Sequence, residues 1–357
     1  MRSKHIAGLD QLRFFMALWV TIGHCELYPN LNGIVSGDTL PGIVLRGVIH
    51  NMVNGPAAVI VFFVISGFCI HLPYRDKTQP IPFLSYFTRR YVRICAPLVV
   101  ALLLAKPLEL KLALFERSIL WSLICEEIYY LVYPLLRATA NRIGWRPLIL
   151  FAFTAAFVLA LTDPTLGLTV IPNDPTAGDY PSFGWRLNWL LGLPCWLLGC
   201  LLAEKENGQT VTLPQLLGWR SVVWAASAVA SVLRFHSPIK YPFTLNLFAV
   251  LVFFWLSREI AYYRDRDPMS IFEGAGKWSY SLYLVHPHAQ LIWKTWLLFT
   301  FPPLLRWPIH LAFILSCSYV FYRLVEKPTH NLARRLSLKI NRLHSPAAHQ
   351  LSVADSG

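Results

Sequence analysis

GLDQLRFFMALWVTIGHCELY, residues 8–28, is a membrane-length apolar run that contains an acid, an arginine and a histidine. On an α-helix, Arg13 and His24 return to nearly the same face and lie roughly 16 Å apart along the axis. Asp10 lies on that face too. Ionisable groups at membrane depth are costly and point to a bundle interior or a functional cavity. The stretch therefore favours a membrane helix that does more than anchor the chain.

Ala17 and Thr21 lie between the ionisable residues on this face. Their small side chains predict room beside the helix, as along a lined path. The alternative is structural, with Asp10 and Arg13 as an interfacial ion pair one turn apart and His24 as a contact between helices. The stretch alone leaves both interpretations open.

Composition indicates a polytopic membrane protein rather than a soluble domain. Of 357 residues, 55% are hydrophobic and only 14% are charged. The net charge of +13 would suggest a nucleic-acid partner in a soluble protein. Here it is interpreted as topology, because lysine and arginine gather in alternate loops. We expect lipid around the chain and no nucleic acid bound to it.

Ten apolar segments are predicted membrane helices, at residues 9–28, 57–73, 86–105, 118–136, 147–162, 185–203, 219–235, 243–260, 278–298 and 306–325. The predicted fold is therefore all-α, with about ten transmembrane helices. Most of the 32 lysines and arginines fall on the side of the N-terminus, which places both termini in the cytoplasm. The predicted organisation is a membrane domain over 1–328 and a basic, polar and largely disordered tail over 329–357.

The longest loops, about 29–56 and 163–184, are rich in Gly, Pro, Asn and Asp. Both are predicted on the outer side, where they could form a lid or a platform for an acceptor. The seven cysteines show no CxxC pair and no metal-ligand spacing, so we expect packed thiols. His286 and His288 do not share a helix face, and no metal site is predicted.

A cluster of arginines lies at the inner mouth of the third predicted span, in YFTRRYVRICAP. Guanidinium groups suit phosphates because they combine a lasting charge with paired donors. Arg89, Arg90 and Arg93 therefore fit an anionic cytosolic donor such as a coenzyme A thioester. Ordinary positive-inside topology explains Arg89 and Arg90 equally well, but it explains Arg93, one turn deeper, less well.

Two adjacent glutamates lie in the apolar stretch WSLICEEIYYLVYPLL. Glu126 and Glu127 differ by about 100° around a helix, so one is expected to face the interior and the other a partner. Such a carboxylate could orient His24 or stabilise its protonated form. Structural ion pairing is the alternative.

Two further segments contribute candidate side chains. Ser66 and Gly67, in VIVFFVISGFCIHLPYRDK, would allow close helix approach, or would form a cavity wall where Ser66 contacts substrate. His286, in KWSYSLYLVHPHAQLIW, is a candidate hydrogen-bond partner of the substrate. Glu326 and Lys327, near the end of the last span, are interpreted as interfacial charges.

Six segments in this order resemble acyltransferase family 3, the ten-helix integral-membrane acyltransferases that modify bacterial glycans and some small molecules. They are LDQLRFFMALWVTIGH, FFVISGF, RRYVRI, WSLICEEIYYLVYP, SYSLYLVHP and the closing EKP. The resemblance implies that Arg13 and His24 form the essential pair of the first helix, with His24 as the catalytic base. It also places Arg90 and Arg93 on the family's basic motif, and Glu126 and Glu127 on its Trp-Ser-Leu-Glu motif.

The resulting hypothesis is an O-acyltransferase of the bacterial cytoplasmic (inner) membrane. It would move an acyl group, most simply acetyl, from acyl-CoA to a hydroxyl of a cell-surface polysaccharide, lipopolysaccharide or exopolysaccharide precursor. Acyl-CoA would be a co-substrate, with no bound cofactor. An alcohol is a poor nucleophile at neutral pH, and imidazole supplies a base of suitable pKa. Cys25 as an acyl carrier is a minor alternative, since it lies about 100° from the Arg13 face.

Two other classes of protein remain as alternatives. A transporter of an anionic solute could use the same buried Arg, Glu and His residues, but the chain lacks the paired interrupted helices typical of transporter repeats. A membrane sensor or scaffold would explain the outer loops but not the ionisable stripe.

Overall fold

The computed structural model describes residues 6–28, 39–76, 80–110, 120–166, 179–205, 208, 210–297 and 302–343, which are helical with no strand among them. The α-helices are α1 (Leu9–Cys25), α2 (Leu40–Met52), α3 (Gly55–His71), α4 (Phe83–Ala105), α5 (Trp121–Ile143), α6 (Trp145–Leu161), α7 (Gly184–Glu204), α8 (Leu213–His236), α9 (Tyr241–Tyr262), α10 (Ser270–Gly276), α11 (Ser279–Trp296), α12 (Pro303–Phe321) and α13 (Lys327–Leu343). Short turns η1 (Leu72–Tyr74), η2 (Tyr180–Phe183) and η3 (Tyr322–Glu326) join some of them.

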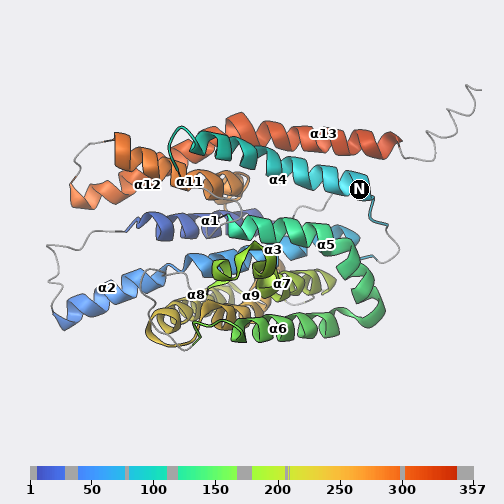
Figure 1. Ribbon diagram of the computed structural model, residues 1–357, viewed down its shortest axis with the longest axis horizontal. Helices are drawn as coiled ribbons and strands as arrows, with labels where there is room; N and C mark the ends of the chain where they lie inside the picture. The colour runs from blue at the N-terminus through green and yellow to red at the C-terminus, as the bar shows by residue number, and fades with distance from the viewer. Residues whose placement is uncertain are drawn as a thin grey trace, which may run out of the picture.

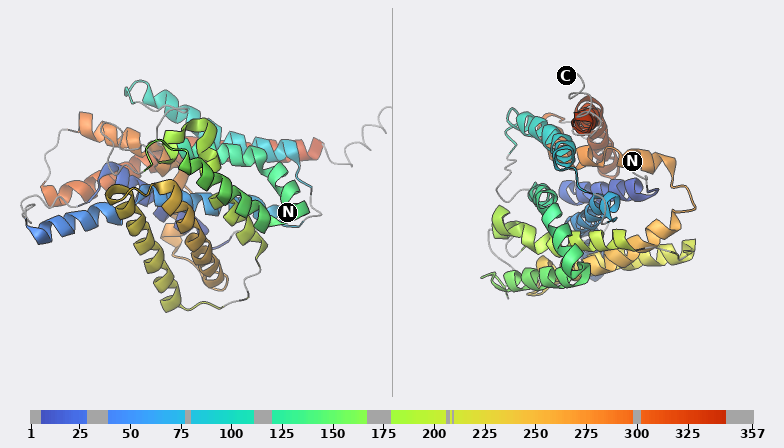
Figure 2. Two further views of the ribbon diagram at one scale, coloured as in Figure 1. Left: turned by 60° about the horizontal axis from the view of Figure 1, so that its bottom comes forward. Right: turned by 90° about the vertical axis from the view of Figure 1, so that its right-hand side faces the viewer.

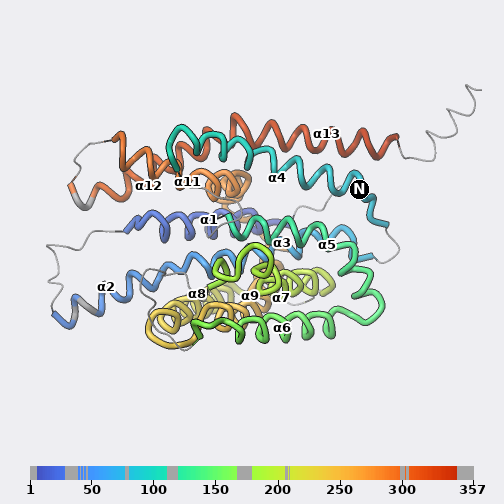
Figure 3. The backbone as a smooth tube through the Cα atoms, in the orientation of Figure 1, coloured from blue at the N-terminus to red at the C-terminus, as the bar shows by residue number. Residues whose placement is uncertain are grey.

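Most helices run along the long axis of the molecule as one bundle (Figure 1). Helix α3 lies in its interior, in contact with α1, α7 and α9 (Figure 3). Helices α8 and α9 pack as a hairpin that lies steeply to this axis (Figure 2, left). Helices α4 and α13 run side by side along one edge (Figure 1).

Glycines bring α3 and α7 into direct backbone contact. A Cβ atom on Gly67 would overlap the carbonyl oxygen of Trp196, and one on Gly199 would overlap the carbonyl oxygen of Val64. Small residues at helix crossings are how membrane helices approach closely enough to gain dispersion energy. The close approach predicted at Ser66 and Gly67 is confirmed.

A helix forms in each of the ten segments predicted from sequence. Five helical stretches of the described chain are long and apolar enough to cross a membrane, by length and composition: Gly47–Tyr74, Tyr180–Glu204, Leu213–His236, Tyr241–Tyr262 and Leu305–Leu343. The protein is thus a multi-pass membrane protein by this criterion. The number of about ten crossings and the cytoplasmic termini stay predictions.

The structure differs from the sequence prediction in two places. Helix α2 lies within the predicted loop 29–56, where Pro41 at its first turn and the apolar GIVL that follows suit a helix. Residues 329–343, predicted as disordered tail, form most of α13, which buries Ala333 and Ser337. Its basic residues are compatible with a helix because they share one face and leave the other free to pack. Residues 344–357 and most of the predicted loop 163–184 lie outside the described residues.

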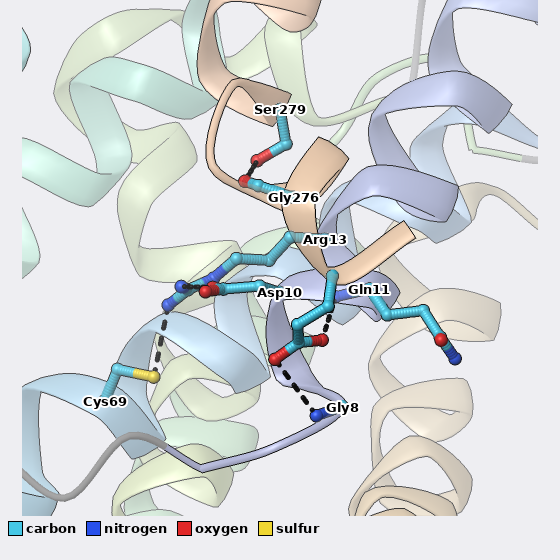
Figure 4. A network of polar contacts seen from close by, with 8 residues as sticks. Gly8, Asp10, Gln11, Arg13, Cys69, Gly276 and Ser279 are labelled. Carbon is cyan, nitrogen blue, oxygen red and sulfur yellow. Dashed lines mark hydrogen bonds and ion pairs between the residues drawn. The ribbon is translucent and has the colours of Figure 1, made fainter. Parts of the chain in front are cut away.

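The start of α1 is fixed by the short helix α10. The carboxylate of Glu273 accepts hydrogen bonds from the backbone N–H groups of Gly8 (3.2 Å) and Gln11 (3.0 Å) (Figure 4). These are N–H groups of the first turn, which have no partner within the helix. Gly276 packs so closely on the carbonyl of Asp10 that any Cβ would overlap it. This contact holds the turn that carries Asp10 and Arg13.

Candidate active site

A cavity of about 530 Å³ lies among α1, α3, α4, α5 and α11, and η3 and α13 complete it. Most of its charged lining is basic. The charged and titratable lining residues, tyrosines aside, are Asp10, Arg13, Cys69, Arg89, Arg90, Arg93, Glu126, Lys277, Glu326 and His330. The cavity therefore gathers the arginines predicted from two separate segments of the sequence.

Arg13 is held at the cavity wall by two contacts. Its guanidinium donates to Asp10 Oδ1 at 2.8 Å and to Cys69 Sγ at 3.1 Å (Figure 4). The ion pair between Asp10 and Arg13, offered as the structural alternative, is confirmed. The pair also faces the cavity, so it orients a cation there.

The arginines of α4 line the same cavity as Arg13. The guanidinium of Arg90 lies over the ring of Tyr130, 5.9 Å from its centroid, an arrangement that favours a cation. Lys277 and His330 add positive or protonatable groups that the sequence analysis did not single out. Neither residue was a candidate from the sequence. Lys277 lies between α10 and α11, and His330 lies on α13, a helix that the sequence did not predict.

Glu126 ends a chain of hydrogen bonds that crosses from α7 to α5. Trp196 Nε1 donates to Ser66 Oγ at 3.3 Å. The Tyr130 hydroxyl donates to Glu126 Oε1 at 2.7 Å, so the Ser66 hydroxyl must donate to Tyr130, 3.0 Å away. Ser66 and Glu126 line the cavity as predicted, but the Ser66 proton is already used inside the protein.

Glu127 does not line the cavity. Both of its carboxylate oxygens are buried without a hydrogen-bond partner among the described residues. The carboxylate contact to His24 expected from Glu126 or Glu127 is absent from the described part of the chain. Glu126 is instead bonded to Tyr130.

Glu326 was wrongly interpreted as an interfacial charge. Its side chain is 3% exposed, and its carboxylate accepts from the backbone N–H (3.1 Å) and the hydroxyl of Ser281. It lies at the end of η3, a π-helical turn, and such turns change which side a following residue faces. This turn brings Glu326 into the cavity, where it attracts Arg93.

His24 is paired with His286. His24 Nδ1 and His286 Nε2 are 3.0 Å apart, and the two rings are inclined by 30°. His286 is 1% exposed, whereas His24 is exposed at the end of α1. His286 thus contacts His24, and its role as a hydrogen-bond partner of the substrate stays a prediction.

The predicted path along α1 is not open. Ala17 and Thr21 are both 0% exposed and neither lines the cavity, and α1 packs against α11. Ser122 and Tyr283, whose hydroxyl groups are 2.9 Å apart, line the cavity. The Tyr283 ring lies 6.1 Å from that of His286, so the histidine pair lies next to this part of the cavity wall.

Comparison with known proteins identifies the class. The family described as an acyltransferase domain, acyltransferase family 3, matches residues 6–323. The chain belongs to this family, and it is a membrane enzyme that transfers acyl groups. It is similar to acyltransferase MdmB of Streptomyces mycarofaciens, at 25% identity over 323 residues, which cover 80% of this chain and 79% of that protein. No solved structure matches. Glu326 and His330 lie beyond the matched region.

Proposed function

We propose that this enzyme is an O-acyltransferase that moves an acyl group, most simply acetyl, from acyl-CoA to a carbohydrate hydroxyl at a bacterial cytoplasmic membrane. The observation that carries the proposal is the arginine-lined cavity, whose wall at Tyr283 adjoins a pair of imidazoles. The cavity suits an anionic donor, and the imidazole suits a hydroxyl acceptor. Cell-surface polysaccharide, lipopolysaccharide and exopolysaccharide precursors supply such hydroxyls.

The donor end is argued from charge. Arg89, Arg90 and Arg93 line one cavity with Arg13, Lys277 and His330, and these basic groups outnumber the three lining carboxylates. The carboxylates are Asp10, Glu126 and Glu326, of which Glu326 attracts Arg93. Several guanidinium groups in one cavity repel one another unless an anion joins them, and phosphates accept their paired donors. The phosphates of coenzyme A would meet this requirement. The pantetheine arm would then extend toward Tyr283.

The chemical step is argued from His24. Its imidazole would take the proton of the acceptor hydroxyl as the oxygen attacks the thioester carbonyl carbon. The tetrahedral oxyanion would collapse by breaking the carbon–sulfur bond, and the proton on His24 would pass to the departing thiolate. The products are the O-acyl ester and free coenzyme A. Cys25 is a poor acyl carrier here because its side chain is buried, 5% exposed.

The experiment is an assay with purified protein in proteoliposomes, labelled acetyl-CoA and a panel of glycans. We expect label on a glycan hydroxyl together with release of free coenzyme A. Uptake of labelled acetyl-CoA into the vesicles without thioester cleavage would instead support a transporter and contradict the proposal. Heat-inactivated protein in the same vesicles controls for spontaneous transfer.

A further inference from the structure

We propose that His286 is a positioning residue that holds His24 in a single tautomer, so that Nε2 of His24 is the atom that takes the proton. This inference rests on the proposed function and adds the identity of the reacting nitrogen. It follows from a chain of two hydrogen bonds whose direction is set at one end.

The chain starts at a backbone carbonyl. His286 Nδ1 lies 3.2 Å from the carbonyl oxygen of Leu282, one turn earlier on α11. A carbonyl oxygen only accepts, so Nδ1 of His286 carries a hydrogen. Pro287 follows His286 in α11 and has no N–H, so the carbonyl of Tyr283 lacks its usual helical partner. The acceptor at Leu282 thus favours the Nδ1–H form of His286.

The tautomer of His286 then determines the tautomer of His24. A neutral imidazole with a hydrogen on Nδ1 has its lone pair on Nε2. His286 Nε2 is 3.0 Å from His24 Nδ1, so His24 must donate there. Nδ1 of His24 therefore carries its hydrogen, and the lone pair of the neutral ring lies on Nε2. This hydrogen assignment follows from the network.

The position of Nε2 agrees with this role. It lies beside the first turn of α3, where a Cβ added to Gly55 would stand 3.9 Å from it. His24 is exposed whereas His286 is buried, so of the two histidines it is His24 that an acceptor can reach. Tyr283 and His288 are the other titratable groups that act on His286 or lie against its ring. Neither is within the two-bond chain.

His286 would also act when His24 becomes charged. The Nδ1–H of the imidazolium would still donate to Nε2 of His286, and a hydrogen bond from a charged donor is roughly twice as strong as a neutral one. A carboxylate has this position in many hydrolase triads, and the wrong tautomer there costs about 10⁴-fold in rate. A neutral imidazole stabilises the charged ring less than a carboxylate does. We therefore expect turnover to fall about 10- to 10²-fold without His286.

The first test compares His286→Leu with His286→Gln. Leucine removes the acceptor, and turnover should fall about 10- to 10²-fold with little change in the KM for acyl-CoA. Glutamine keeps an acceptor oxygen and should recover part of the lost turnover. His288→Gln is the matched control, because the ring of His288 contacts the carbonyl of Ala101 (2.9 Å) and lies outside the two hydrogen bonds that link Leu282, His286 and His24, and it should retain normal turnover.

These variants separate the inference from the proposed function. If His24→Ala is inactive while His286→Leu turns over at the native rate, the positioning role is wrong and the base remains. If His24→Ala is as active as the wild type, the proposed chemistry itself is wrong.

The second test uses wild-type protein, so its result does not depend on whether the His286 variants fold. Nitrogen-15 NMR of wild-type protein labelled at histidine should show neutral His24 with hydrogen on Nδ1 and a bare Nε2. Hydrogen on Nε2 of neutral His24 would overturn the inference.

Gly55→Ala adds a methyl group beside Nε2 in ordinary contact and should lower turnover about tenfold. Gly218→Ala, in open space on α8, is its control, and equal activity of the two variants would also overturn the inference.

Discussion

Arg93 illustrates how one side chain serves both packing and charge. It lines the cavity with Arg89 and Arg90, and Glu326 attracts it from the π-helical turn η3. A guanidinium presents planar, paired donors to an anion. Lysine at the same position would keep the charge but lose the planar pair of N–H donors.

Arg93→Lys should therefore weaken the donor more than the chemistry. We expect the KM for acyl-CoA to rise about tenfold, as for the loss of one charge-assisted hydrogen bond of about 1.5 kcal/mol, with kcat changed little. Steady-state kinetics with varied acyl-CoA measures this. Arg142→Lys, at an exposed site on α5, is the control. An unchanged KM in Arg93→Lys would remove this arginine from the donor site.

At the scale of single residues, the sequence predicted which side chains line the cavity better than it predicted which side chains they contact. Arg13, Arg90, Arg93, Ser66 and Glu126 face one space, as their positions in apolar helices indicated. The partner of His24 was not predictable, because His286 is 262 residues away and the hydrogen bond depends on how α1 meets α11. Glu326 was missed because a π-helical turn breaks the period from which a helix face is inferred.

The contact between α3 and α7 is the element on which the cavity wall depends. Gly67 and Gly199 let the two backbones touch, and Ser66, next to Gly67, then meets Trp196 and Tyr130. A methyl group at Gly67 has only rigid backbone in front of it. The helices would have to separate, and the hydrogen-bond chain to Glu126 would lengthen.

Gly67→Ala should lower stability by about 1–3 kcal/mol, the usual cost of overpacking. Thermal unfolding in detergent, followed by circular dichroism, should show a lower midpoint than the wild type. Gly218→Ala replaces a glycine of the same helical kind in open space and should leave the midpoint unchanged or slightly raised. Equal midpoints for the two variants would contradict the close packing described here.

Helix positions were predictable where apolar length decides them, and less so elsewhere. Helices form in all ten predicted segments. Helix α13 was missed because its many basic and polar residues resemble a solvated tail, although they lie on one face of a helix that packs along α4. The same helix brings His330 to the cavity.

For the whole molecule, transfer from a cytosolic donor requires that the arginine-lined cavity open toward the cytoplasm. The positive-inside pattern predicts that the turn between α7 and α8 is cytoplasmic and the turn between α8 and α9 is external. Gly208→Cys and Pro238→Cys place a thiol in each turn, at exposed positions. Both belong in a background without native cysteines.

An impermeant maleimide should label Pro238→Cys in intact cells and label Gly208→Cys only after permeabilisation. The physical reason is that the membrane separates the reagent from the cytoplasmic turn. Reversed labelling would place the arginine-lined mouth on the external side, away from cytosolic acyl-CoA.

The measurement that tests the central claim most directly is acyl transfer by His24→Gln in proteoliposomes, beside the wild type and His24→Ala. Glutamine can hydrogen-bond but cannot take up a proton at neutral pH. Both variants should insert normally and lose about 10²-fold or more of turnover, the usual effect of removing a general base. The wild-type rate should rise with pH as the imidazole loses its proton. Near-native turnover of His24→Gln at normal expression would show that His24 is structural and would contradict the account.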